Sequence, residues 1–128
     1  MATRVRERTE RKRKEKDNRP IAKVKYAGFS PSKARIVLDN IRGKQVDVAL
    51  ALMEQSKQGA AETVAKLLKS AIANAENNKG LNRADLIVAE TWAGPGPLLK
   101  RIDIRARGRA NRILKRTCHM TIILDEAK

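Results

Sequence analysis

Cysteine is almost absent from this chain of 128 residues, and a single cysteine excludes a disulfide within the chain and favours a reducing compartment. No apolar run approaches the ~20 residues of a membrane-spanning helix, and no apolar segment follows the charged N-terminus as it does in a secretion signal. The acidic residues within 1–19 also argue against an Arg-rich transit peptide. We therefore expect a cytoplasmic protein that has no membrane partner.

Aromatic residues and metal-binding side chains are scarce as well. One Trp, one Tyr and one Phe argue against an aromatic platform for single-stranded nucleic acid. One Cys and one His provide no cluster of ligands with metal-binding spacing, so we expect no metal and no cofactor. Cys118 and His119 are adjacent, and adjacent residues on a strand point to opposite faces, so they do not form a nucleophile and its base. We expect no catalytic residues and no enzyme activity.

Positive charge is what the sequence has in excess. Lys and Arg total 29 against 14 Asp and Glu, which gives a formal net charge of +15. The net charge is +5 over residues 1–19, +4 over 20–99, +7 over 100–116 and −1 over 117–128. Such a basic chain is typical of proteins that bind a polyanion. The segments 1–19 and 100–116 carry most of the excess and are the candidate binding segments.

Residues 1–19 differ in composition from the rest of the chain. Their charges alternate without an apolar stripe, and Pro20 closes the segment. A segment of this kind has too little apolar surface to bury for folding on its own. We expect a basic N-terminal extension over 1–19 that is disordered in the free protein, followed by a single domain over 20–128.

The periodicity of apolar residues within this domain predicts an α+β fold. Apolar residues alternate with period two in three expected strands, at 22–26, from 85 towards 92 where 93–97 interrupt it, and at 117–124. They repeat with helical spacing in three expected helices, from an N-cap at Ser30 to a stop at Gly43, at about 46–55 and at about 60–78. We expect these three helices to pack on a small antiparallel sheet.

Residues 101–116, with the sequence RIDIRARGRANRILKR, do not fit such a core. Lys100–Arg116 contains eight basic residues, most of them arginines, and one acid, Asp103. If the segment pairs with itself, Gly108 suits a turn that needs positive φ, and the ribbon reaches about 26 Å at ~3.3 Å per residue. An isolated hairpin is marginally stable in water and requires a surface to lie against. We expect a long protruding basic β-hairpin over about 98–113.

The arginines of this hairpin favour RNA as its partner. A guanidinium group matches phosphate with two hydrogen bonds and stacks on bases, and the lack of aromatic residues indicates recognition of the backbone and shape of structured RNA.

Two other motifs carry less weight. Gly94–Pro97 lacks the Gly-Lys-Ser/Thr ending of a phosphate loop, and the helix at 60–78 has no outward arginine to read guanine, as a helix-turn-helix requires.

Several stretches form a longer pattern: Ser30–Arg35, Ile41–Lys44, Ser70–Asn78, Gly96–Pro97, Lys100–Arg101, Arg105–Ala110, Lys115–Thr117 and His119. Together they resemble the bacterial L twenty-two family of large-subunit ribosomal proteins, over about residues 22–124, in order and without a gap. Three positions depart from the family pattern. Ile104 stands where proline is usual, Ser32 where arginine is usual and Cys118 where serine is usual.

The resemblance implies a globular α+β domain on the outer surface of the ribosome, and a hairpin that threads through ribosomal RNA to line the polypeptide exit tunnel. It also implies a role in subunit assembly and no catalysis. The implied partners are large-subunit ribosomal RNA, neighbouring large-subunit ribosomal proteins and the nascent polypeptide, and we expect no homo-oligomer.

The resemblance carries over two sets of residues by position. The expected RNA-binding residues are Lys33, Arg35, Arg42, Lys44, Lys100, Arg101, Arg105, Arg107, Arg109, Arg112, Lys115, Arg116 and His119. The expected tip of the hairpin is Ile104, Arg105, Ala106, Arg107 and Gly108. The alternative is a free RNA- or DNA-binding regulatory protein that uses the same basic hairpin.

Overall fold

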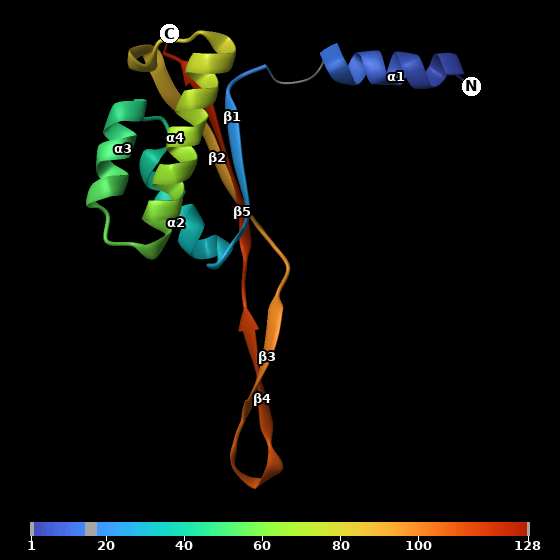
Figure 1. Ribbon diagram of the computed structural model, residues 1–128, viewed down its shortest axis with the longest axis vertical. Coiled ribbons are helices and arrows are strands. Elements are labelled where there is room, and N and C mark those ends of the chain that lie inside the picture. The colour runs from blue at the N-terminus through green and yellow to red at the C-terminus, as the bar shows by residue number, and fades with distance from the viewer. Residues whose placement is uncertain (1, 15–17, 128) are drawn as a thin grey trace.

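The computed structural model describes residues 2–14 and 18–127. Figure 1 shows the helices and strands in their arrangement. In chain order they are α1 (Ala2–Lys14), β1 (Ile21–Ala27), α2 (Pro31–Ile41), α3 (Val46–Gln55), α4 (Gly59–Lys79), β2 (Leu86–Pro95), β3 (Leu99–Ile104), β4 (Ala110–Lys115) and β5 (Cys118–Glu126). Short 3-10 turns lie at Arg83–Asp85 and Ala106–Gly108.

The body of the protein is a three-stranded antiparallel sheet with helices on one face. The strand order is β1-β5-β2, so the strand that comes last in the sequence lies in the middle. Helices α2 and α4 lie against the sheet, and α3 packs against α4 (Figure 1). This arrangement confirms the α+β class, and the three helices expected from apolar spacing are α2, α3 and α4.

The core lies between β5 and the helices. Cys118, Met120, Ile122 and Leu124 alternate along β5 and are fully buried against the helical layer, as the period-two pattern predicts. Burial of each large aliphatic side chain stabilises the fold by about 1.5–3 kcal/mol. Thr121 and Ile123, on the other face, are also buried, because β5 is the central strand and its neighbours' side chains flank it on both sides.

A bulge at Ala89 changes which side chains of β2 face the core. Before the bulge, the buried residues of β2 are Leu86 and Val88; beyond it, they are Thr91 and Ala93. One extra residue reverses the alternation of a strand, so Trp92 points away from the helices. The strand continues to Pro95 although the sequence predicts an interruption from residue 93, because β2 is an edge strand, where proline is tolerated.

The segment before β1 contains a helix that the sequence does not predict. Helix α1 covers Ala2–Lys14, where alternating charges favour a chain without regular structure. Arg, Lys and Glu are good helix formers, which accounts for a helix that lacks an apolar stripe. Figure 1 shows α1 apart from the body. Residues 1 and 15–17 of the expected extension lie outside the described residues, and its disorder in the free protein stays a prediction.

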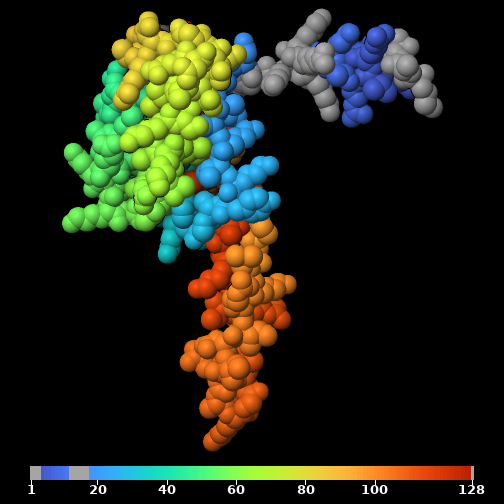
Figure 2. All heavy atoms as spheres, viewed as in Figure 1, coloured from blue at the N-terminus to red at the C-terminus, as the bar shows by residue number. Residues whose placement is uncertain are grey.

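Strands β3 and β4 form a separate two-stranded sheet that extends from the body. They pair from Leu99 with Lys115 to Ile104 with Ala110, and the hairpin leaves the body as a narrow projection (Figures 1 and 2). The sequence predicts a hairpin that ends at about residue 113, and the return strand β4 ends two residues later, at Lys115. The reason is that the turn is centred on Arg107 and the two strands that flank it, β3 and β4, have equal lengths. Gly108 has φ 71°, as the sequence predicts for the turn.

Candidate nucleic-acid interface

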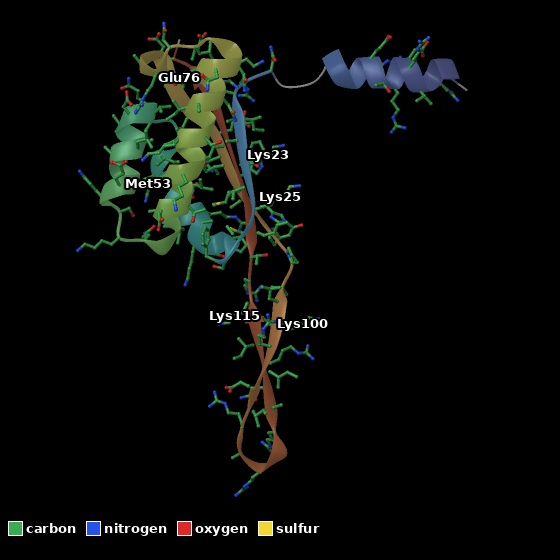
Figure 3. The ribbon with its side chains drawn as sticks, viewed as in Figure 1. Lys23, Lys25, Met53, Glu76, Lys100 and Lys115 are labelled. Atoms are coloured by element: carbon green, nitrogen blue, oxygen red, sulfur yellow. The ribbon has the colours of Figure 1, made fainter. Side chains whose placement is uncertain are left out.

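The proximal part of the hairpin places a basic residue opposite an aliphatic residue at each step. The four pairs are Leu99 with Lys115, Lys100 with Leu114, Arg101 with Ile113 and Ile102 with Arg112. Successive pairs point to opposite faces of a strand ribbon, so cations project from both faces. Figure 3 shows Lys100 and Lys115 at the level where the two strands begin to pair. A ribbon with cations on both faces suits an anionic partner that surrounds it.

Nothing within the described chain covers this hairpin. Every side chain of β4 is exposed, and in β3 only Asp103 is partly buried. Ile102 and Ile104 are 74% and 83% exposed, and they lie two residues apart on one strand, so they form a contiguous apolar surface. The cations and the aliphatic side chains of the hairpin are therefore both available to a partner.

The tip of the hairpin is a five-residue turn held by its own backbone. Arg105 N–H donates to the carbonyl of Arg109 at 2.8 Å, and Arg107 and Gly108 both take left-handed conformations, with φ 59° and 71°. The Arg105 guanidinium lies 2.8 Å from the carboxylate of Asp103, the one acid of the segment. The turn therefore leaves Arg107 and Arg109 exposed and without an ion pair among the described residues, whereas Arg105 has an exposed one.

The hairpin joins the body at a closely packed neck. Gly96 N–H donates to the carbonyl of Thr117 at 2.9 Å, and the Thr117 hydroxyl donates to the carbonyl of Pro97 at 2.7 Å. A Cβ atom on Gly96 would collide with Thr117 Oγ1 and lie 3.2 Å from His119 Cε1. His119 in turn accepts the backbone N–H of Tyr26 at Nδ1, over 3.0 Å. These contacts fix the direction in which the hairpin leaves the sheet.

The expected RNA-binding residues of α2 lie away from the hairpin, beside strand β2. Arg42 donates from Nε to Thr91 Oγ1 at 3.2 Å and from Nη2 to the Thr91 carbonyl at 2.9 Å, and it pairs with Asp39. Arg35 donates from Nε to the carbonyl of Ala93 at 3.2 Å. Both arginines therefore fasten α2 to the sheet, although each residue remains exposed to solvent. Lys44 is exposed just beyond α2.

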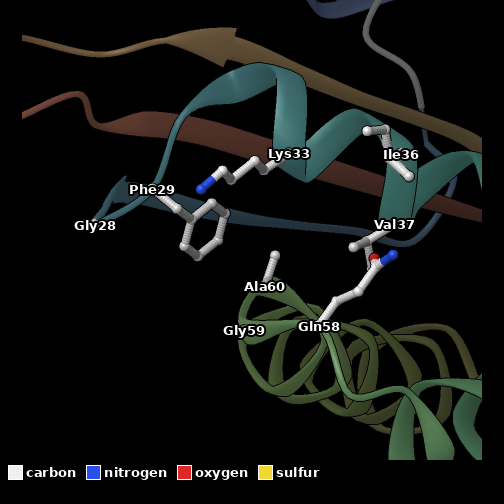
Figure 4. Close-up of a pocket in the computed structure, with 8 residues that line it drawn as sticks. All are labelled: Gly28, Phe29, Lys33, Ile36, Val37, Gln58, Gly59 and Ala60. Carbon is white, nitrogen blue, oxygen red and sulfur yellow. The ribbon is translucent and has the colours of Figure 1, made fainter.

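Lys33, the remaining cation of this set, borders an apolar groove. Figure 4 shows it beside Phe29 on one wall, with Ile36 and Val37 further along α2 and Ala60 at the start of α4 opposite. The groove encloses about 510 Å³. The structure thus separates the sequence-predicted residues into a hairpin set, an α2 set and His119 at the neck.

Sequence reasoning missed several exposed residues on the face of the sheet that the helices leave open. Lys23 and Lys25 project from β1 on the side away from the helices (Figure 3), and Trp92 on β2 is 47% exposed. The alternation of apolar and polar residues at 22–26 places Lys23 and Lys25 on the polar face of the strand, so this pattern could have identified them. The exposure of Trp92 could not be predicted, because it depends on the bulge at Ala89, which has no signature in the sequence.

Cys118 is the one cysteine of the chain, and it is buried. Burial raises the pKa of the Cys118 thiol and keeps it protonated, so it is a poor nucleophile. In residues 2–14 and 18–127, no three His, Cys, Asp or Glu side chains come together as metal ligands. Among the described helices, none has the length and apolar character needed to cross a membrane.

Comparison with known proteins identifies a family for this chain. Residues 22–125 match the family model described as ribosomal protein L22p/L17e. The large ribosomal subunit protein uL22 of Lachnoclostridium phytofermentans is 52% identical over 111 residues, which cover 87% of each chain. The protein of the same name from Acetivibrio thermocellus is 54% identical over 103 residues, 80% of this chain and 82% of the relative. That from Agathobacter rectalis is 52% identical over 130 residues, 98% of this chain and 99% of the relative.

Proposed function

The chain belongs to the ribosomal protein L22p/L17e family, and from this premise we propose that it is a structural constituent of the large ribosomal subunit whose basic hairpin binds ribosomal RNA and lines the polypeptide exit tunnel. Its place is the cytoplasmic ribosome. The observation that carries the proposal is the hairpin itself, an exposed two-stranded ribbon with cations on both faces and no covering surface within the described chain.

Physical chemistry supports RNA as the partner that surrounds the hairpin. The net charge over residues 100–116 is +7, so the like charges of the hairpin repel one another unless phosphate groups neutralise them. Arginine forks bind phosphate with two parallel hydrogen bonds, and they do so with little loss of side-chain freedom. The RNA-binding residues of the hairpin are Lys100, Arg101, Arg105, Arg107, Arg109, Arg112, Lys115 and Arg116. Arg35, Arg42, Lys33, Lys44 and His119 contribute from the body.

The exposed aliphatic residues support a second contact of the hairpin. Ile102 and Ile104 lie on the same face near the tip, with Ala110 opposite Ile104. Binding to phosphate requires only the cations of the hairpin, so the aliphatic side chains remain available to contact a polypeptide that passes the tip. We assign this surface to the nascent polypeptide, together with residues 104–108, which comprise the last residue of β3 and most of the turn.

Membership of a family of ribosomal proteins supports the remaining assignments of the proposal. The protein supports assembly of the subunit, contacts neighbouring ribosomal proteins with its body, needs no cofactor or metal, and acts without catalysis and as a single copy. Residues 1–19 form a basic extension, in which the structure describes helix α1 at Ala2–Lys14, and residues 20–128 form one domain.

Co-sedimentation tests this proposal against a free RNA- or DNA-binding regulator. Cell extract is run on a density gradient at high salt, and the protein is quantified in each fraction. A ribosomal constituent follows the large subunit at about one copy, because many buried contacts resist screening. Recovery of the protein at the top of the gradient would favour the regulator and contradict the proposal.

A further inference from the structure

The face of the sheet that lies opposite the helices is uncovered in the described part of the chain. The side chains on it come from all three strands: Lys23, Lys25 and Tyr26 on β1, His119 and Thr121 on β5, and Trp92 on β2. Cross-strand pairing places Lys23 and Trp92 in one row on either side of Thr121, about 10 Å apart at ~4.8 Å per strand. This open face is distinct from both the hairpin and the groove beside α2.

Two of the three aromatic residues of the chain lie on this face. Trp92 is 47% exposed and Tyr26 is 65% exposed. Tyr26 is also held in place, since its N–H bonds His119 Nδ1 and its ring meets the imidazole edge to face, with ring centres 5.0 Å apart. It takes a left-handed conformation with φ 60°, which is costly for a bulky residue and concentrates at functional sites.

The charge left free on this face is positive. Its acids, Glu90 and Asp125, both lie near Arg19, with oxygen-to-nitrogen distances of 2.8 and 3.9 Å. Lys23 and Lys25 have no ion-pair partner within the described residues, and both point away from the body (Figure 3). The face therefore combines a flat aromatic ring with unpaired ammonium groups, which is the chemistry that holds an unpaired nucleotide.

The open face also continues into the hairpin. Strand β5 leads to β4 through Arg116 and Thr117, β2 leads to β3 through Gly96, and His119 joins the neck to Tyr26. An RNA strand bound to the hairpin can therefore extend along the sheet without leaving the protein. This continuity and the positive charge favour RNA over a protein partner.

We propose that the open face binds an unpaired nucleotide of ribosomal RNA, with the base stacked on Trp92 and the adjacent phosphates held by Lys23 and Lys25. The inference rests on the proposed function, because it adds a second RNA site to a protein whose hairpin is the first.

Tryptophan fluorescence tests the proposal directly, because Trp92 is the only tryptophan of the chain. The full-length protein is titrated with deproteinised large-subunit ribosomal RNA, and binding is followed independently by filter retention. We expect quenching of the emission with the same midpoint as binding. Binding without any change in emission would overturn this inference and leave the hairpin proposal intact. Failure of the wild-type protein to bind the RNA would overturn both.

Three variants separate stacking from charge. Trp92→Leu is expected to weaken binding by about 5- to 150-fold, the loss typical of one stacked base, and Trp92→Phe to retain most of the affinity. Lys23→Glu with Lys25→Glu is expected to reduce the slope of log affinity against log salt by about 2, one for each phosphate contact. Melting curves check that each variant is folded.

The matched control is Lys66→Glu with Lys69→Glu, which makes the same charge change on α4 at exposed lysines. It is expected to leave affinity and slope close to the wild-type values. If the RNA binds with equal affinity to the wild type, to Trp92→Leu and to the Lys23/Lys25 double variant, the proposal is wrong. A protein partner then becomes the better explanation of the open face.

Discussion

Reversal of the charge at the hairpin tip separates RNA binding from folding. In the triple variant, Arg105, Arg107 and Arg109 are all changed to Glu. These side chains are exposed, and the one ion pair lost, between Arg105 and Asp103, is a surface pair that contributes about 0–1 kcal/mol. Substitutions at such sites usually change stability by no more than ~0.5 kcal/mol. The melting temperature of the isolated protein should therefore remain almost unchanged.

The loss of RNA affinity should be large. A hydrogen bond to a charged group contributes ~1.5–3 kcal/mol, so each lost arginine–phosphate contact costs about tenfold or more. Three contacts together give a loss of ~10³-fold, and the new carboxylates add repulsion. Because each duplex phosphate contact contributes about 0.9 to the slope of log affinity against log salt, the slope should fall by about 3.

Two measurements, melting by circular dichroism and incorporation into large subunits, test this prediction. The matched control changes Lys57, Lys66 and Lys69 to Glu, which alters the net charge equally at exposed positions around α4. The control should assemble normally, and the tip variant should be missing from subunits. Normal incorporation of the tip variant would refute the claim that the hairpin lies within RNA.

Four further predictions concern the neck, the core, the thiol and the segments outside the core. Gly96→Ala should destabilise the protein by about 1–3 kcal/mol, because its Cβ collides with Thr117, whereas Gly94→Ala, which meets open space, should cost less in the same denaturant titration. Leu68→Ala should cost about 2–5 kcal/mol by opening a cavity in the core, and unchanged stability would contradict the packing described. Cys118 should react with an alkylating reagent at the rate of unfolding, since burial and a raised pKa keep the thiol protonated; rapid labelling of the native protein would show that it is accessible. Trypsin should cut the isolated protein first within 1–19 and 98–113, and protection of both segments would contradict their expected mobility.

The secondary structure of the body could be predicted because its core residues follow simple periods. Met120, Ile122 and Leu124 alternate along β5, and the apolar residues of α4 recur at helical spacing, so the type of each element was readable without the structure. The turn at Gly108 was readable for a similar reason, since glycine is the residue that adopts positive φ without strain.

The features that escaped prediction depend on contacts between distant residues. The bulge at Ala89 arises from pairing with β5 more than thirty residues later, so the outward position of Trp92 has no local signal. Arg35 and Arg42 are expected RNA-binding residues, and nothing in the sequence indicates that both bind the backbone of β2. Helix α1 was missed because its residues favour a helix by propensity alone, and the apolar stripe used for the prediction is absent.

The position of β5 determines when the body can fold. Strands β1 and β2 do not pair with each other; β5 is the one strand with which each of them pairs, and Ile21 is matched with Ile123. The sheet therefore cannot close until almost the whole chain has been synthesised, and this high sequence separation makes closure slow. The basic hairpin leaves the translating ribosome before β5 does. RNA contacts made by the hairpin can thus precede completion of the sheet, so docking and folding of the body become coupled steps of one assembly reaction.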